Sequence, residues 1–269
     1  MADAPPNKPE LIGIELEVPE GKLRAAMALP PKPLRLAELA LSTMGISEKL
    51  TDVAVKREAR QGRAVTCQKG CGACCRQIVP LSPPEAWLIA DVANGLPPAR
   101  RAEALAVFAR AGEALSTSGL REQLQQRIET AEQMMGLAVA YFALGVPCPF
   151  LRDESCSIYP YRPSICREYL VTSPPENCGT IDRALIKLGE GPTAPARASV
   201  QPVARIPVHV RLSEALARLT GKLLDREPEV IPLTMALEWA AAHQDEGRRT
   251  WDARMLIEGL VAELSPGAS

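Results

Sequence analysis

Apolar residues follow helical spacing along most of this chain, and the alternation typical of strands is scarce. Across residues 34–60 they recur every three to four positions, which predicts helix. A turn at Gly45, with Ser47 as N-cap, is expected to divide this stretch into two helices. Gly62 is placed to end the second one, because glycine readily adopts the left-handed conformation after a helix.

Further helices are predicted on both sides of a central cysteine-bearing region. Residues Ser82-Pro83-Pro84-Glu85 have the form of a capping box, with proline tolerated in the first turn, and the helix that follows should end near Gly95. Other amphipathic patterns cover residues 98–115, 119–144, 210–224, 228–242 and 247–264. Their Met and aromatic positions are expected to pack in the core rather than to line a cofactor pocket.

Segments rich in proline and glycine interrupt this pattern. Residues 1–33 end in Pro30-Pro31-Lys32-Pro33 and show poor periodicity, so we expect an arm lying on the domain. Residues 189–205 are typical of a linker or surface loop. Residues 203–210 form the one convincing extended stretch, and Pro207 within it favours an edge strand.

Composition narrows the classes of partner. Lys and Arg total 31 against 32 Asp and Glu, for a net charge of −1, so no global basic field attracts nucleic acid or anionic membrane. Only 4% of residues are aromatic, which leaves few stacking platforms for single-stranded nucleic acid. No stretch approaches the roughly 20 apolar residues of a membrane span, and the N-terminus lacks a secretion-signal pattern. We therefore expect a cytoplasmic protein without nucleic-acid or membrane partners.

Eight cysteines fall in three groups and carry the candidate chemistry. A reducing compartment disfavours persistent disulfides, and adjacent Cys74 and Cys75 suit a bridge network less well than a metal site. The candidate metal ligands are Cys67, Cys71, Cys74 and Cys75 in the first group, Cys148, Cys156 and Cys166 in the second, and Cys178.

The spacing of the first group suits a metal. Thiolates are soft ligands that select zinc or iron–sulfur clusters, and three of them come from one short loop as Cys67-x3-Cys71-x2-Cys74. Gly70 and Gly72 flank the middle thiol and give the backbone freedom to approach sulfur closely. Closing a four-coordinate site requires a thiol from the later groups, so the site would tie the two ends of the cysteine region together.

Positive charges lie within the same groups. Four thiolates on Zn²⁺ or on an oxidised four-iron cluster leave a charge of about −2, which requires compensation when partly buried. Arg162 and Arg167 are embedded in the second group and are expected to lie beside the thiolates, whereas Lys69 is expected to be solvated. His209 and His243 lie far along the chain and are expected to be structural.

Together these patterns predict a mostly α fold: a small irregular helical domain with a loop-built cysteine metal centre and a C-terminal helical extension. The expected divisions are a Pro-rich N-terminal arm at 1–33, a cysteine-cluster domain at 34–188 with a helical insertion at 76–147, a linker or loop at 189–205, and the extension at 206–269.

The ordered cysteine segments resemble a known family. The matching segments are the Cys67–Cys75 cluster, Cys148-Pro-Phe-Leu, Cys156-Ser-Ile-Tyr159, Arg162-Pro-Ser-Ile-Cys166-Arg167-Glu-Tyr169 and Glu176-Asn-Cys178. Together they resemble the CxxCxxCC, or YkgJ-like, family of zinc- or iron-chelating domains, and the resemblance implies metal binding without an agreed activity. Cys67 and Cys71 are separated by three residues where the family name implies two. A related flagellin lysine-methylating protein shares the motif, but this chain shows no glycine-rich segment of the kind that holds S-adenosylmethionine.

The cysteine pattern leaves two candidates for the metal, an iron–sulfur cluster and zinc. Eight thiols could form two zinc sites, one cluster with spare thiols, or one of each, and adjacent Cys74 and Cys75 would suit a division between two centres. Soft ligands without a nearby histidine favour an iron–sulfur cluster, such as a 4Fe–4S centre, slightly over zinc. The C-x3-C-x2-C spacing of radical enzymes is also present, but the α/β barrel that surrounds it in those enzymes is not predicted.

Three functions remain. The first is a metal-binding or electron-transfer protein with the cluster as its working part. The second is a metal- or thiol-dependent enzyme of unknown substrate, with a reactive thiol such as Cys75. The third is a structural zinc protein whose C-terminal helices bind a protein partner.

Overall fold

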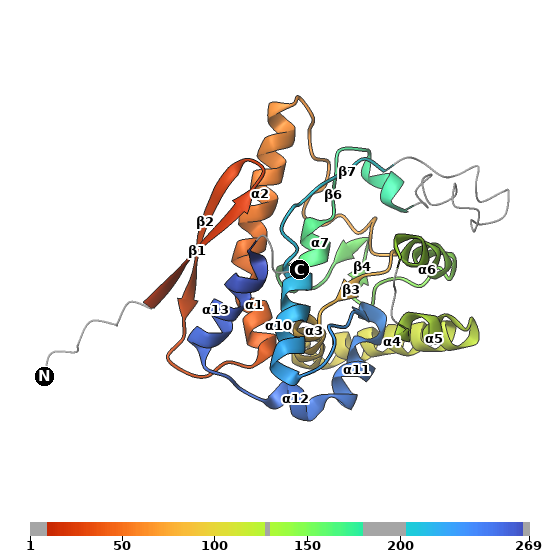
Figure 1. Ribbon diagram of the computed structural model, residues 1–269. Coiled ribbons are helices and arrows are strands. Elements are labelled where there is room, and N and C mark those ends of the chain that lie inside the picture. Colours follow the sequence, from red (N-terminus) through yellow and green to blue (C-terminus); the bar gives the residue numbers. More distant parts are fainter. Residues whose placement is uncertain (1–9, 127–129, 180–202, 266–269) are drawn as a thin grey trace, which may run out of the picture.

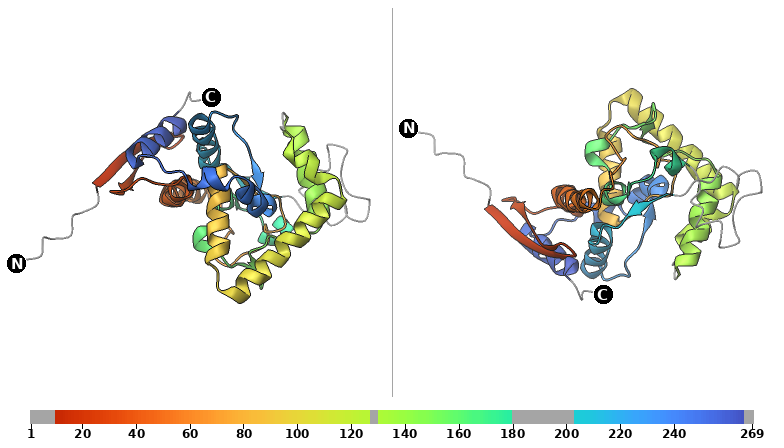
Figure 2. Two further views of the ribbon diagram at one scale, coloured as in Figure 1. Left: turned by 90° about the horizontal axis from the view of Figure 1, so that it is seen from below. Right: turned by 90° about the horizontal axis from the view of Figure 1, so that it is seen from above.

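The computed structural model describes residues 10–126, 130–179 and 203–265. Most of the described residues are helical, which confirms the predicted mostly α fold. Figures 1 and 2 place a long N-terminal hairpin at one end of the molecule and two helices of the predicted insertion, α5 and α6, at the other. The cysteine region lies between them, in the part of the chain with the shortest elements.

The N-terminal segment forms a β-hairpin where an arm without regular structure was expected. Strands β1 (Glu10–Val18) and β2 (Gly21–Leu29) pair antiparallel along their whole length, with Glu10 opposite Leu29 and Val18 opposite Gly21. In β1 the buried Ile14 and Leu16 alternate with exposed glutamates, which is the pattern of a half-buried strand. The expectation of poor periodicity was wrong, because the alanines of β2 favour helix and obscured the alternation.

The first two helices divide at a different residue from the one predicted. Helix α1 (Leu36–Ser42) and helix α2 (Met44–Arg60) meet at Thr43, whose hydroxyl donates to the Ala40 carbonyl over 2.7 Å. This local hydrogen bond competes with a continuous helix. Ser47 is therefore not an N-cap but a buried residue inside α2.

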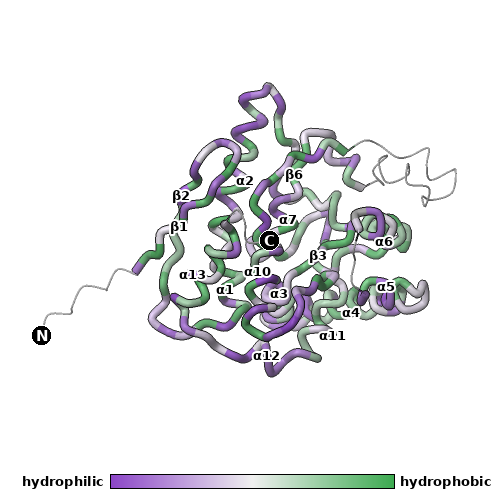
Figure 3. Tube along the Cα trace, in the orientation of Figure 1, coloured by the Kyte–Doolittle hydropathy of each residue, from purple (hydrophilic) through white to green (hydrophobic). Residues whose placement is uncertain are grey.

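Helix α2 terminates where it was predicted to, just before Gly62. Gly62 has a φ of +73°, a conformation that a residue with a side chain adopts only at an energetic penalty. Figure 3 shows hydrophilic residues along this outer end of the helix, which extends beyond the packed part of the molecule.

The helices of the predicted insertion agree with the sequence in part. The Ser82–Glu85 capping box is present and starts α3 (Pro83–Gly95), and α4 spans Pro98–Thr117. The single helix predicted over 119–144 is wrong, because the segment holds two helices, α5 (Leu120–Gln125) and α6 (Ala131–Ala143). Another capping box begins α6, where Thr130 Oγ1 accepts a hydrogen bond from the Gln133 amide over 3.1 Å.

The C-terminal region is also divided into shorter helices than predicted. Helix α10 (Leu212–Leu224) matches the expectation, but the helix expected from residue 228 begins only at Ala236, because the chain first forms a short strand and a 3-10 turn. Pro232 explains the delay, since its ring fixes an extended backbone and removes an amide donor. The remaining elements are η3 (Leu233–Met235), α11 (Ala236–Ala242), α12 (Gln244–Arg248) and α13 (Ala253–Leu264).

The other described strands are only two residues long. They pair antiparallel as β3 (Pro80–Leu81) with β8 (Ile231–Pro232), β4 (Leu151–Arg152) with β5 (Ser155–Cys156), and β6 (Leu170–Val171) with β7 (Arg205–Ile206). Of the predicted strand at 203–210 only β7 forms, at the edge of its pair and directly before Pro207. Most of the predicted linker at 189–205 lies outside the described residues.

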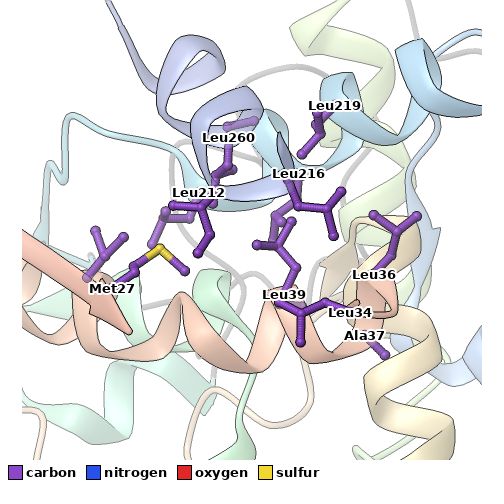
Figure 4. Close-up of a cluster of buried hydrophobic side chains, with 14 of the residues drawn as sticks. Met27, Leu34, Leu36, Ala37, Leu39, Leu212, Leu216, Leu219 and Leu260 are labelled. Atoms are coloured by element: carbon purple, nitrogen blue, oxygen red, sulfur yellow. The ribbon is translucent and has the colours of Figure 1, made fainter. Parts of the chain in front are cut away.

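Two hydrophobic clusters fill the interior and share the long helix α3. The first joins α1, α10 and α13 to the hairpin, and Figure 4 shows Leu39 of α1 against Leu216 of α10 and Met27 of the hairpin beside Leu212. The second joins α4, α5, α6 and α11 beneath the cysteine region. In the part of the chain that the structure describes, no helix combines the length and the apolar character needed to cross a membrane.

Candidate metal centre

The first cysteine group lies in a loop of tight turns between α2 and β3. The Cys71 amide donates to the Gln68 carbonyl over 3.1 Å, and the Cys75 amide donates to the Gly72 carbonyl over 3.0 Å. Gly70, with a φ of +92°, permits the chain to reverse between these turns. The successive turns bring four thiols into one compact segment.

Gly72 lets this loop press against the second cysteine group. A Cβ atom at this position would lie 2.5 Å from the Glu154 carbonyl oxygen and 2.5 Å from Leu151 Cδ1. Glu154 belongs to the tight turn between β4 and β5, where both turn residues have positive φ. The Cys148 amide also donates to the Cys75 carbonyl over 2.7 Å. The backbones of the two cysteine groups are therefore in direct contact.

Six thiols line one cavity of about 70 Å³ at this contact. Cys156 is the last residue of β5, and Cys166 lies in the short helix α7 (Ser164–Glu168), which follows the 3-10 turn η1 (Tyr159–Tyr161). Apolar side chains complete the wall, among them Phe150 and, from the C-terminal region, Leu233. The six thiols are those of Cys71, Cys74, Cys75, Cys148, Cys156 and Cys166.

The remaining two cysteines lie beside this cavity, near Cys71 and Cys74. Cys67 Sγ accepts a hydrogen bond from the Val171 amide over 3.3 Å. Cys178 is buried in the 3-10 turn η2 (Pro175–Gly179), and its carbonyl accepts from Gln77 Nε2 over 2.9 Å. Burial raises the pKa of the Cys178 thiol, and the negative charges of Cys74, Cys67 and Cys71 raise it further.

Burial and mutual contact raise the pKa, and so favour the protonated form, of Cys67, Cys74, Cys75, Cys156, Cys166 and Cys178. Burial raises the pKa of Cys67, Cys156 and Cys166, and that of Cys178 to about 11. A hydrogen bond to Cys75 raises the pKa of the Cys74 thiol, and a hydrogen bond to Cys148 raises that of Cys75 to about 12. A metal must displace these protons, so its binding depends on pH.

The donor atoms fit a metal that prefers sulfur ligands. Their side chains, however, are not arranged around a single metal position. Across the described residues, no group of three or more His, Cys, Asp or Glu side chains is arranged to hold one metal ion. A cysteine sulfur moves between three staggered positions by rotation about a single χ1 bond. Closing a site in this cavity therefore requires side-chain rotation, while the backbone already brings the six thiols to one cavity.

The two arginines expected beside the thiolates have different surroundings. Arg162 lines the cavity, and its charge favours the thiolates of Cys74 and Cys166 against the effect of burial. Its guanidinium carbon lies 4.0 Å from the centre of the Tyr159 ring. Arg167 points elsewhere: its guanidinium donates to the Arg162 and Pro160 carbonyls over 3.1 and 2.6 Å and pairs with Glu48 of α2 at 3.1 Å. Arg167 thus holds the second cysteine group against α2.

Two further polar residues, Gln77 and Arg76, link the cysteine groups. Gln77 Nε2 donates both to the Cys178 carbonyl and to the Tyr169 hydroxyl, the latter over 3.1 Å, and so links the first and third cysteine groups. Arg76 pairs with both carboxylate oxygens of Glu154, at 3.0 and 2.6 Å, across the contact between the first two groups. No sequence pattern marks a glutamine for such a role.

Three residues that were not expected to bind metal lie off the wall of the thiol cavity. Lys69 is exposed, with its ammonium 5.9 Å from the centre of the Tyr159 ring. His243 Nδ1 is 2.8 Å from the Trp239 carbonyl oxygen, and its ring stacks on that of Trp239 with centroids 4.3 Å apart. His209 is an exposed residue, and neither histidine lines the thiol cavity.

Comparison with known proteins supports the interpretation of the cysteines. The curated proteins and the solved structures gave no match. Residues 66–182 match the model of the CxxCxxCC family, described as a "Putative zinc- or iron-chelating domain". The matched segment contains all eight cysteines and leaves the N-terminal hairpin and helices α10 to α13 outside. It confirms the predicted resemblance of the cysteine region to the CxxCxxCC family.

Proposed function

We propose that this protein holds an iron–sulfur cluster of the 4Fe–4S type through its clustered cysteines and works in electron transfer or as a redox accessory protein. The observation that carries the proposal is the cavity lined by six thiols drawn from two separate cysteine groups. Soft thiolate donors without a histidine among them favour a cluster. When bound, such a cluster supplies reversible one-electron chemistry.

The surroundings of the cavity support this proposal. Arg162 offsets part of the negative charge that four thiolates bring, and apolar residues such as Phe150 and Ile158 exclude water from one side. Both features favour holding a charged centre away from bulk solvent. The roles of Cys67 and Cys178, which lie beside the cavity, are either to complete this centre or to hold a second one with Cys71 and Cys74.

Structural zinc is the second candidate, and one observation favours it. The strands of the cysteine region pair over only two residues each, so local secondary structure gives this region little stability of its own. A zinc ion bound by four thiolates would link the first and second cysteine groups and stabilise them directly. The C-terminal helices would then serve as the surface that binds a partner. The thiol-dependent enzyme remains the third alternative, without a substrate.

Anaerobic purification of the untagged protein, followed by elemental analysis and an absorption spectrum, tests the proposal. Iron with a matching amount of sulfide and a brown colour is the expected result, and stoichiometric zinc in colourless protein would replace the first candidate with the second. Cys71→Ser and Cys74→Ser are each expected to lose metal, because both sulfurs line the cavity. Full metal content in both variants would refute the assignment of these ligands.

A further inference from the structure

One buried carboxylate outside the cysteine groups connects to them directly. Glu85, in the first turn of α3, is only 3% exposed. Its Oε2 accepts hydrogen bonds from the Ser82 amide over 3.0 Å, from the Ser82 hydroxyl over 2.8 Å and from the Ser213 hydroxyl over 2.6 Å. Its Oε1 accepts from the Ser164 amide over 2.8 Å. An ordinary capping box uses only the first of these four bonds.

The donors belong to three separate parts of the fold. Ser82 caps α3, and Ser213 lies in α10, outside the segment that matches the metal-chelating family. Ser164 is the first residue of α7, the helix that carries Cys166 two positions later. Pro163 and Cys166 both line the thiol cavity, and Pro163 and Ser164 also line a smaller cavity that Glu85 borders. The Glu85 carboxylate therefore supports the backbone that enters the metal centre.

A carboxylate is the group that suits this position. It offers two oxygens with about four acceptor sites, and here all four donors are uncharged and little exposed to water. An amide in its place provides a single acceptor oxygen and two donor hydrogens, so it cannot accept at both ends. Truncation to alanine leaves the buried Ser164 amide without its partner, which is unfavourable enough to move the start of α7.

We propose that Glu85 is a positioning residue of the metal centre, which holds the first backbone amide of α7 and thereby fixes Cys166 at the thiol cavity. Through Ser213 the same carboxylate makes α10 part of that support. The inference rests on the proposed function, since it assigns Glu85 a role in presenting one of its thiols. Glu85 does not contact the thiols itself, and it acts through the backbone of α7.

A second, independent anchor makes the role of Glu85 testable. Arg167 holds the other end of α7 through its contacts with the Pro160 carbonyl and Glu48. Helix α7 thus stays attached to α2 when Glu85 is removed, and the change is confined to its first turn. The effect should appear at Cys166 and not at Cys67, which lies outside the cavity.

The test measures cysteine reactivity in metal-free protein and Co²⁺ affinity in the same set of full-length variants. The set contains Glu85→Ala, Glu85→Gln and, as the matched control, Thr130→Ala, which removes the capping box at α6. Alkylation of each cysteine is followed by mass spectrometry under reducing conditions. Co²⁺ binding is followed by the sulfur-to-cobalt charge-transfer absorption, which reports thiolate coordination directly.

For Glu85→Ala we expect Cys166 to be alkylated faster than in the original protein, with Cys67 unchanged, and Co²⁺ to bind about tenfold more weakly. Glu85→Gln should fall between, because its amide oxygen still accepts from the Ser164 amide, and Thr130→Ala should match the original protein in both measurements. Folded Glu85→Ala and Glu85→Gln with unchanged Cys166 reactivity would overturn the inference. If Glu85→Ala does not fold, Glu85→Gln alone decides by the same two measurements.

The two measurements also separate this inference from the proposed function. Original protein that binds no Co²⁺, zinc or iron refutes metal binding, while the alkylation of Cys166 in metal-free protein still decides whether Glu85 positions it. Original protein that binds metal, together with Glu85 variants of equal affinity and equal Cys166 reactivity, refutes the positioning role alone.

Discussion

Gly72→Ala is expected to separate the first two cysteine groups. The added Cβ would lie 2.5 Å from the Glu154 carbonyl oxygen and 2.5 Å from Leu151 Cδ1, whereas ordinary contacts begin at 3.4 Å. The loop and the β4–β5 turn must therefore move apart by about 1 Å, because the close contact leaves no room for the added atom. Part of the clash is with backbone, which cannot rotate away as a side chain can.

The magnitude follows from this overpacking. Extra atoms in a well-packed interior destabilise by about 1–3 kcal/mol. For a chain of this size a loss of about 2 kcal/mol lowers the melting temperature by about 4–8 °C. Because the movement also separates Cys74 and Cys75 from Cys148 and Cys156, bound metal per chain should fall together with stability.

Thermal unfolding followed by circular dichroism, with metal analysis of the same samples, measures both effects. Gly45→Ala is the matched control, since Gly45 is exposed, lies in helix α2, and would place its new Cβ with no neighbouring atom within 4 Å. This control should be neutral or more stable by up to about 1 kcal/mol. A Gly72→Ala protein with the original melting temperature and metal content would refute this close approach between the two cysteine groups.

Three further predictions concern the core, a buried carboxylate and the metal. Phe150→Ala should reduce the free energy of unfolding by about 3–5 kcal/mol in urea titrations, because Phe150 is 2% exposed and forms one wall of the thiol cavity; a loss below about 1 kcal/mol would contradict this packing. Burial alone would raise the pKa of Glu263, but hydrogen bonds from Lys222 and Arg218 outweigh burial and lower this pKa in the folded protein. The stability that these bonds give is therefore present above the unfolded pKa of about 4.3. It is lost as the pH falls through the lower pKa of the folded state. Glu263→Gln should therefore destabilise the protein at about pH 7 and much less at about pH 3. The control Glu258→Gln, at an exposed position, should leave stability unchanged at either pH. An equal loss of stability in Glu263→Gln at both pH values would refute the pairing of Glu263 with Lys222 and Arg218. Removal of the metal with a chelator should lower the melting temperature, and lowering the pH from about 7.5 to about 5.5 should weaken metal binding, because the thiols must lose protons to bind; metal affinity independent of pH would show that thiolates are not the ligands.

Local sequence signals predicted those parts of the fold that depend on neighbouring residues. The Ser82–Glu85 capping box and the end of α2 at Gly62 were correct, because each depends on hydrogen bonds or backbone conformation within a few positions. The hairpin was missed because its stability comes from pairing and from burial against α13 rather than from the composition of β2. The break at Thr43 was misplaced because Gly45 is tolerated in the first turn of α2.

The centre was predictable in its chemistry but not in its geometry. Cysteine spacing identified the candidate thiols, yet it gave no sign that Cys67 and Cys178 lie beside the cavity and not on its wall. Glycine is required at position 72 because the backbone there packs against Glu154, which is distant in sequence. The sequence alone indicated only that Gly72 would give the backbone conformational freedom beside a cysteine. Similarly, Glu85 was recognised for its local bond to Ser82, whereas its bonds to distant residues depend on tertiary packing.

The order in which the wall of the thiol cavity is synthesised limits when metal can be enclosed. Leu233 closes one side, and its amide donates to the Val79 carbonyl over 2.9 Å, so the segment that carries it must arrive before the cavity is complete. At about 5–20 residues per second, it emerges about 8–30 s after the first cysteine group. During that interval the nascent chain presents its first thiols to the cell without their final cover. Any factor that delivers metal, or any oxidant that damages thiols, therefore meets this protein most easily while it is still being made.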